Sequence, residues 1–246
     1  MRQPKHITVI GAGFMGCVIA TIYARHGFDV VLHDAVPGML GSFTQRALPI
    51  AHSLGTPKLS PEDMVSRVRL VETLEAAVDG ADLVHEVIQE DLTLKQDLFK
   101  RLDQLCTPDV VLASNTSSFL LSHLCRDVVH KERVVGIHYI TPAHIVQAVE
   151  IIVADFTPAE LIAWARAFVA QIDHVAIVEP EIAENTVPDT TATTASRPGT
   201  RKISRSMPSI TLKARPDRNS TSPISTKSGM GVSENEETES MVLRAI

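Results

Sequence analysis

The chain has 246 residues, of which 44% are hydrophobic and 21% charged, a composition typical of a globular protein with room for a sizeable core. Its formal net charge of -6 gives no reason to expect nucleic acid or a membrane surface as a partner, and no apolar run approaches the roughly 20 residues of a membrane-spanning helix. Its 3 cysteines have neither the number for a disulfide framework nor metal-ligand spacing, so we expect no metal and a reducing compartment, the cytoplasm.

Short β-branched runs alternate with helical patterns from residue 6 to about residue 178. Helical spacing predicts helices at 14–26 and 92–105, and a last helix with Thr157 as N-cap, Pro158 at the first position and Glu160 closing a capping box. The alternation predicts an α/β fold of the Rossmann type, a doubly wound and mainly parallel sheet covered on both faces. We expect its strands at 6–10, 29–34, 81–88, 109–115, 133–140, 148–154 and 174–178.

The composition changes near residue 180. Residues 181–246 are rich in Ser, Thr, Pro and Arg and show no apolar periodicity. Such a segment buries too little apolar surface to offset its chain entropy. We therefore expect a Rossmann domain at 1–180 and a low-complexity, disordered tail at 181–246, with an interaction segment around RKISRS as an alternative role for the tail.

The stretch VIGAGFMG (9–16) has the G-x-G-x-x-G spacing between a predicted strand and a predicted helix. In a dinucleotide-binding turn, Gly11 permits the tight turn, Gly13 lets the backbone approach the pyrophosphate, and Gly16 lets helix and strand pack closely. The helix N-terminus then faces the phosphates with free N–H groups. Asp34 ends the next strand, where its carboxylate would accept ribose hydroxyls and repel a 2′-phosphate, so we expect NAD as the cofactor; a glycine turn without a ligand is the alternative.

Further motifs follow this turn in a fixed order. They are VHEVIQEDLTLK (84–95), ASNTSS (113–118), GIHYITP (136–142) and VEII (149–152). Together with the glycine turn they resemble the NAD-binding domain of the L-3-hydroxyacyl-CoA dehydrogenases, over roughly residues 5–178. The resemblance implies an NAD-dependent oxidoreductase with a small-molecule substrate, from a family that is dimeric through a helical domain after its last Rossmann strand.

By this resemblance, His138 is the general base and Glu150 its partner on an adjacent strand, with the turn around Pro142 between them. Hydride leaves an alcohol carbon readily only while the hydroxyl proton is being removed, and a histidine suits that task. A carboxylate behind the ring fixes its tautomer and stabilises the imidazolium. Taken singly, His138 could be a satisfied strand-end histidine and Glu150 a solvated edge carboxylate.

The resemblance also implies roles for three other residues. Ser117 would hydrogen-bond the substrate hydroxyl and the nicotinamide region, and Glu90 and Lys95 would contact the cofactor. The simpler alternatives are that Ser117 or Ser118 caps the following helix, and that Glu90 and Lys95 form an ordinary exposed helix start.

Three departures from the family pattern bear on function. Thr141 stands where the family has Asn, Arg46 is the only Lys or Arg in the 37–54 stretch where the family grips CoA, and neither a Pro-Gly-Phe turn nor a helical pattern follows residue 178. We expect oxidation of the 3-hydroxyl of a 3-hydroxyacyl-CoA or a related hydroxy acid to the ketone. The alternatives are a silent NAD-binding module that lacks its substrate domain, and a dehydrogenase of a free hydroxy acid such as gulonate.

Overall fold

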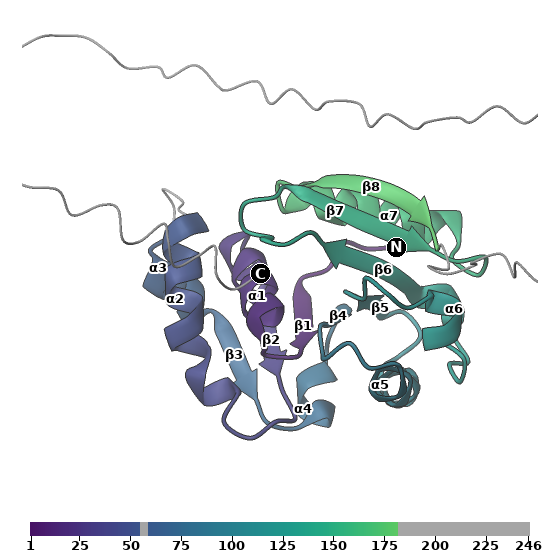
Figure 1. Cartoon of the computed structure of the whole chain (residues 1–246), viewed down its shortest axis with the longest axis horizontal. Coiled ribbons are helices and arrows are strands. Elements are labelled where there is room, and N and C mark those ends of the chain that lie inside the picture. Colours follow the sequence, from purple (N-terminus) through teal and green to yellow (C-terminus); the bar gives the residue numbers. More distant parts are fainter. Residues whose placement is uncertain (55–58, 182–246) are drawn as a thin grey trace, which may run out of the picture. The chain divides into compact units, whose positions relative to one another are not determined.

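The computed structural model describes residues 1–54 and 59–181. In this part of the chain, eight strands form a single sheet in the order β3-β2-β1-β4-β5-β6-β7-β8 (Figure 1). Neighbouring strands are parallel except β6 and β7, which are antiparallel. The predicted doubly wound, mainly parallel sheet is confirmed. The strands are β1 (His6–Ile10), β2 (Asp29–His33), β3 (Val68–Val71), β4 (Leu83–Glu86), β5 (Val111–Ser114), β6 (Val134–Tyr139), β7 (Ala148–Val153) and β8 (Val175–Pro180).

Helices cover both faces of this sheet. One face carries α1, α2, α3 and α7, and the other carries α4, α5 and α6 (Figure 1). None of the helices in the described ranges has the length and apolar character to cross a membrane. The helices are α1 (Phe14–Arg25), α2 (Phe43–Leu54), α3 (Pro61–Ser66), α4 (Leu74–Val78), α5 (Leu92–Leu105), α6 (Leu121–Leu124) and α7 (Ala159–Gln171), with short 3-10 turns at Leu40–Ser42 and Lys131–Arg133.

The two faces bury separate apolar clusters, because side chains alternate along each strand. On β4, Leu83 packs toward α1 and α7, whereas Val84 packs toward α5. On β5, Val111 and Leu112 divide between the faces in the same way. Runs of consecutive apolar residues are therefore the strand pattern expected of a sheet that is buried on both sides.

Strand β3 lies between two short helices and was not among the predicted strands. It has four residues, two of them exposed, and it pairs only with β2 at the edge of the sheet. A short edge strand with Arg69 in its middle lacks the continuous apolar run that marked the central strands. Periodicity therefore gives little signal for β3.

The predicted N-cap of the last helix is wrong by one residue. Helix α7 begins at Ala159 with Pro158 as its N-cap, and no side chain caps it. The hydroxyl of Thr157 instead accepts a hydrogen bond from the backbone N–H of Ala154, at 3.0 Å. The preceding turn thus takes the oxygen that the capping box would have used, and the box with Glu160 does not form.

The predicted tail, 181–246, lies outside the described residues except for Glu181. The backbone N–H of Glu181 donates to the carbonyl of Val153 (2.8 Å), which continues the pairing of β7 and β8 by one residue. Its carboxylate accepts from the backbone N–H of Ser122 in the first turn of α6, at 2.9 Å. Glu181 is therefore attached to the Rossmann domain at both its backbone and its side chain.

Candidate active site

The glycine turn joins β1 to α1 at the carboxyl end of the sheet. Gly11 has φ +109, and a Cβ there would lie 2.4 Å from the carbonyl oxygen of Val87. A Cβ on Gly16 would lie 1.8 Å from the carbonyl oxygen of Gly11. No atom lies within 4 Å of the Cβ position of Gly13, which faces an open cavity. The first and third glycines therefore allow close packing, and the second leaves room for a ligand.

Asp34 follows β2 beside this turn. Its carboxylate accepts hydrogen bonds from the backbone N–H groups of Ala12 (2.6 Å) and Val36 (2.7 Å). Each carboxylate oxygen has two acceptor positions, so each keeps capacity for a further donor. Arg46 donates to the carbonyl oxygens of Ala12 and Met39, so its guanidinium is used by the backbone around the turn.

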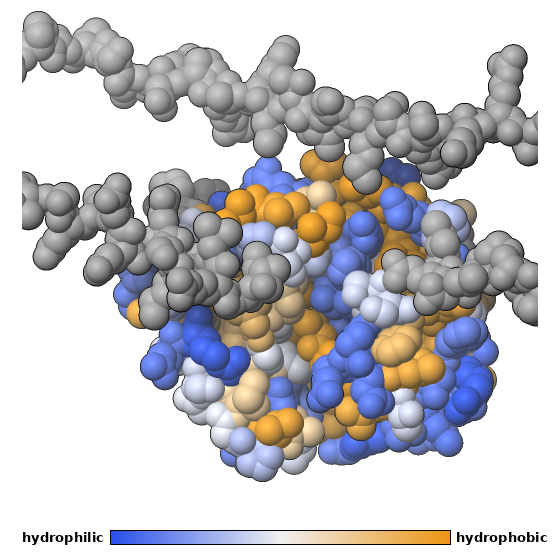
Figure 2. All heavy atoms as spheres, in the orientation of Figure 1, coloured by the Kyte–Doolittle hydropathy of each residue, from blue (hydrophilic) through white to orange (hydrophobic). Residues whose placement is uncertain are grey.

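A cavity of about 820 Å³ opens above the carboxyl ends of β1, β2, β4 and β5. The strand order reverses direction between β1 and β4, and ligands of open α/β sheets bind at such a switch point. Figure 2 shows hydrophobic residues beside hydrophilic ones over β7 and β8, and the exposed large hydrophobic residues of β8 are Val175 and Ile177. Seven of the nine predicted site residues line the cavity: Gly11, Gly13, Asp34, Glu90, Lys95, Ser117 and His138.

His138 and Glu150 lie directly opposite each other in the antiparallel ladder of β6 and β7. The His138 Nδ1 atom is 2.8 Å from the Glu150 Oε2 atom, and the two side chains are 20% and 30% exposed. A carboxylate can only accept, so Nδ1 carries the hydrogen, and in the neutral ring the lone pair is on Nε2. The adjacency of the two strands is confirmed, and Glu150 is not a solvated edge carboxylate, because it is on an interior strand and bonds to His138. The role of His138 as the general base stays a prediction, since a bonded histidine near the end of β6 also fits the simpler alternative.

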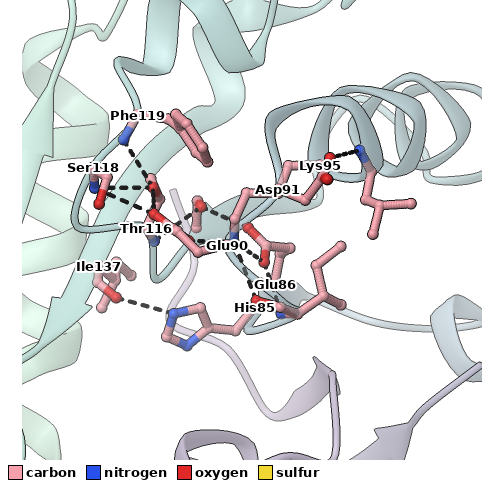
Figure 3. Close-up of polar contacts among 12 residues, drawn as sticks. His85, Glu86, Glu90, Asp91, Lys95, Thr116, Ser118, Phe119 and Ile137 are labelled. Atoms are coloured by element: carbon pink, nitrogen blue, oxygen red, sulfur yellow. Dashed lines mark hydrogen bonds and ion pairs between the residues drawn. The ribbon is translucent and has the colours of Figure 1, made fainter. Parts of the chain in front are cut away.

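A buried ion pair lies beneath the cavity (Figure 3). The Lys95 ammonium is 1% exposed and lies 2.6 Å from Glu86 and 3.1 Å from Glu90. Burial raises the pKa of Glu86, against the opposing charge of Lys95 and a hydrogen bond from Ser114. The alternative of an ordinary exposed helix start is therefore wrong for Lys95.

Glu90 lies at the opening of the same cluster, with 37% of its side chain exposed. Burial acts to raise its pKa, but the hydroxyl of Thr116 and the charge of Lys95 outweigh it, and the pKa of Glu90 is lowered. The carboxylate is therefore held ionised at the cavity wall, with the backbone N–H of Ser118 as a further donor, at 3.2 Å (Figure 3).

Ser117 lies in the loop after β5, where it is exposed and lines the cavity. Helix α6 begins at Leu121 after Leu120, without a side-chain cap, so the alternative that Ser117 or Ser118 caps it is wrong. The loop is held by the Thr116 hydroxyl, which accepts the backbone N–H of Phe119 (3.1 Å) and donates to Glu90.

Several polar residues around the cavity were missed in the sequence. Glu86 and Ser114 end neighbouring parallel strands, and their side chains bond to each other at 2.6 Å. Asn115 follows, and its side-chain oxygen accepts the backbone N–H of Tyr139, at 2.9 Å. Polar residues at the carboxyl ends of two predicted parallel strands are the signal that could have found them.

A tight glycine turn at a helix N-terminus, an open position at its second glycine and an acid at the end of the next strand define a dinucleotide-binding Rossmann protein. These residues fit NAD. The sequence profile of the family "3-hydroxyacyl-CoA dehydrogenase, NAD binding domain" matches residues 6–182, and the chain belongs to this family.

Curated relatives share this domain. A 5-formyl-3-hydroxy-2-methylpyridine 4-carboxylate 5-dehydrogenase of Mesorhizobium japonicum is 32% identical over 177 residues, which are 71% of this chain and 57% of the relative. A probable 3-hydroxybutyryl-CoA dehydrogenase of Deinococcus radiodurans is 37% identical over 147 residues, 58% of this chain and 52% of the relative. The chain therefore spans about half the length of the curated relatives that it matches.

Solved structures agree with this assignment. The 3-hydroxybutyryl-CoA dehydrogenase of Escherichia coli K12 superposes with a TM-score of 0.67 and 27% identity, over 73% of this chain and 39% of that one. The crystal structure of a 5-formyl-3-hydroxy-2-methylpyridine 4-carboxylic acid 5-dehydrogenase, described as an NAD+ dependent dismutase, gives 0.66 and 29%, over 73% and 59%.

Proposed function

We propose that the chain is an NAD-dependent dehydrogenase that oxidises the hydroxyl of a 3-hydroxyacyl-CoA or a related hydroxy acid to a ketone. The observation that carries this proposal is the His138–Glu150 pair, 2.8 Å apart, where His138 lines the same cavity as the glycine turn. NAD, when bound, supplies the hydride acceptor. The cavity then has a cofactor end at Gly13 and a proton-accepting end at His138.

His138 acts as the general base in this proposal. Its Nε2 lone pair takes the hydroxyl proton, while Nδ1 stays bonded to Glu150. The Glu150 carboxylate stabilises the resulting imidazolium. It also fixes the orientation of the ring and the tautomer in which Nδ1 carries the hydrogen. Ser117, whose hydroxyl is exposed at the cavity, orients the substrate oxygen toward His138.

Binding of the cofactor rests on the other predicted residues. Gly11 and Gly16 shape the turn, and the open position at Gly13 would admit the pyrophosphate. Asp34 would accept the adenosine ribose hydroxyls. Glu90 would contact the cofactor from the cavity wall, where the Lys95 ammonium, 3.1 Å away, holds its carboxylate.

Cofactor binding is tested by calorimetric titration of the full chain with NAD and with NADP. We expect NAD to bind more tightly, because the Asp34 carboxylate repels a 2′-phosphate. In an Asp34→Ala variant, the dissociation constants for NAD and NADP should lie closer together than in the wild type. If the folded chain binds neither cofactor at millimolar concentration, the proposal fails.

The role of the base is tested with His138→Gln and Glu150→Gln, measured with NAD and 3-hydroxybutyryl-CoA. Loss of a positioned base lowers kcat by on the order of 10²–10⁴-fold. His123→Gln is the matched control, because His123 is exposed on α6 and does not line the cavity. A His138→Gln variant with the wild-type rate would assign the proton transfer to another group.

The substrate class is a choice between a CoA thioester and a free hydroxy acid such as gulonate. Arg46 is the only Lys or Arg in residues 37–54, and two of its five N–H groups are used by backbone carbonyls, so this stretch offers little to a CoA phosphate. The Mesorhizobium relative is named for a free pyridine carboxylate. A rate comparison between 3-hydroxybutyryl-CoA and free 3-hydroxybutyrate or gulonate decides between the two classes.

A second candidate is an NAD-binding module that turns over no substrate. It is favoured by the partly exposed His138–Glu150 pair and by the half-length match to the curated relatives. Hydride transfer depends on exclusion of water from the site. NAD binding without reduction of any 3-ketoacyl compound would support this candidate. We also place the chain in the cytoplasm, which three buried free cysteines support.

A further inference from the structure

The ladder between β5 and β6 ends two residues before the candidate base. Its last pair is Ser114 with Gly136. Along a strand, the backbone groups of successive residues point to opposite edges. Those of Ile137 and Tyr139 therefore point toward the end of β5, whereas those of His138 point toward β7. Past Ser114, no strand residue is left in this ladder to bond the Ile137 carbonyl or the Tyr139 N–H.

Two side chains take the place of the missing strand. The His85 Nε2 atom is 3.0 Å from the carbonyl oxygen of Ile137, and the Asn115 Oδ1 atom is 2.9 Å from the amide nitrogen of Tyr139. His85 belongs to β4, two strands away, and its side chain reaches Ile137 beyond the end of β5 (Figure 3). Both residues that flank His138 in the sequence are thus anchored by side chains.

The hydrogen-bond pattern of His85 has a single consistent assignment. A carbonyl oxygen only accepts, so Nε2 carries the hydrogen and Nδ1 accepts from the Tyr23 hydroxyl, at 2.8 Å. The Tyr139 hydroxyl in turn donates to the Tyr23 oxygen, at 3.3 Å. These side chains are at most 1% exposed, so no water competes for the bonds.

We propose that His85 is a positioning residue for His138: its Nε2–H holds the Ile137 carbonyl and thereby sets where β6 presents the His138 ring to Glu150 and to the substrate. The proposal rests on the proposed function of His138. Removing the donor leaves the Ile137 carbonyl buried and unpaired. The free-energy cost of this unpaired group favours a shift of the strand toward another donor. A displacement on the order of 1 Å at a reacting group lowers a rate by as much as 10²-fold.

Burial of His85 supports this role. It lowers the pKa of His85 to about 3, although the bond to Ile137 opposes the shift. The ring therefore stays neutral over the range in which a histidine base works, and its donor to Ile137 is always present. Because the network has no described contact with solvent, we assign it to geometry and not to proton transfer.

The test uses the full chain with 15N-labelled histidine and without added cofactor. His85→Leu removes the donor, and His85→Gln keeps an amide that can both donate to Ile137 and accept from Tyr23. The Nδ1–H proton of His138 has a distinct NMR resonance, because Glu150 deshields it. We expect this resonance to shift or broaden in His85→Leu and to return to its wild-type position in His85→Gln. An unchanged His138 signal in folded His85→Leu would overturn the proposal.

The wild-type protein gives a second measurement, which does not depend on whether a variant folds. The proposal requires a scalar coupling across the hydrogen bond between the His85 Nε2–H group and the Ile137 carbonyl carbon. Its absence would overturn the assignment even if His85→Leu cannot be studied.

Kinetics then connect the geometry to the reaction. With NADH and acetoacetyl-CoA, we expect His85→Leu to lower kcat roughly tenfold to a hundredfold at unchanged KM for NADH, and His85→Gln to recover most of it. A general loss of stability would not be rescued in this way. If no variant or wild-type protein turns over, the proposed function fails while the spectroscopic result on His85 still stands.

Discussion

Lys95 and Glu86 are the most deeply buried charged pair at the candidate site, with 1% and 0% of their side chains exposed. We predict that Lys95→Met lowers the free energy of unfolding by about 3–5 kcal/mol, because it leaves the Glu86 carboxylate buried without its partner. Urea denaturation of the variant and the wild type measures the difference.

Two further variants show whether the unpaired charge is the cause. Lys100→Met, on the exposed side of the same helix, should change the stability by less than about 0.5 kcal/mol. The double variant Lys95→Met/Glu86→Leu should regain much of the loss, because it removes the stranded carboxylate as well. A double variant as unstable as Lys95→Met would show that packing, and not charge, sets the cost.

His85 gives the protein a specific dependence of stability on pH. Burial lowers its pKa to about 3 in the folded state, whereas the unfolded chain takes up the proton near pH 6.5. Between these values the unfolded state binds more protons, so the histidine makes stability fall as pH falls, by at most about 1.4 kcal/mol per pH unit.

The effect of His85 is measured as a difference, because other buried groups titrate as well. Urea denaturation of wild type and His85→Gln at several values between about pH 7 and pH 5 should show the smaller loss in the variant. Parallel curves would mean that His85 is protonated in the folded protein too.

Some site residues could be predicted from the sequence because their chemistry depends on local spacing. Gly11 and Asp34 belong to a motif that a strand and a helix frame directly. His138 and Glu150 are neighbours only through strand pairing, and it was the resemblance to a family that linked them. Local spacing does not link His85 and Glu86 to their hydrogen-bond partners, because these partners lie on other strands.

At the scale of elements, the pairing of β6 with β7 holds the candidate pair together. Gly136 faces Ile152 in this ladder, and a Cβ added to Gly136 would lie 2.6 Å from the Ile152 Cβ. We predict that Gly136→Ala costs about 1–3 kcal/mol and lowers kcat, because the strands must separate two residues from His138. Thermal unfolding and the steady-state rate measure the two effects.

Gly41→Ala is the matched control for this prediction. No atom lies within 4 Å of the Cβ position of Gly41, so the added methyl group has space. The control should keep both stability and rate within the error of measurement. A Gly136→Ala variant that behaves like Gly41→Ala would show that the ladder absorbs a methyl group without moving.

The sequence predicts best those elements that are buried on both sides. Central strands such as β1 and β5 are mainly apolar, and both were predicted: β1 is at His6–Ile10 as expected, and β5, expected at 109–115, is at Val111–Ser114. The edge strand β3 pairs with one strand only, and two of its four residues are exposed, so its sequence has no clear apolar pattern. The start of α7 was misplaced because the Thr157 hydroxyl serves the turn before the helix, a contact that spacing alone does not reveal.

At the scale of the whole molecule, one sheet joins the two apolar clusters. We predict a single cooperative transition for the Rossmann domain. The only tryptophan of the chain, Trp164 on α7, is buried and stacks on Phe168, so its fluorescence reports one face of the sheet. Far-ultraviolet circular dichroism reports the helices on both faces, and the two urea curves should coincide.

Saturating NAD extends this test. A ligand that binds only the folded state at 100 times its Kd adds about 2.7 kcal/mol to the free energy of unfolding, and it should move both curves together. Separate midpoints for the two probes would show that the faces of the sheet unfold independently.

The strand order also constrains the sequence in which the protein can assemble. The first strand of the chain is an interior strand, and one of its neighbours, β4, is synthesised more than seventy residues later. During translation, the edge of β1 that pairs with β4 therefore stays unpaired until β4 has been synthesised. The switch point that opens the cavity for a cofactor thus delays formation of the cofactor site, because the glycine turn gains its packing partner Val87 only when the chain beyond β4 arrives.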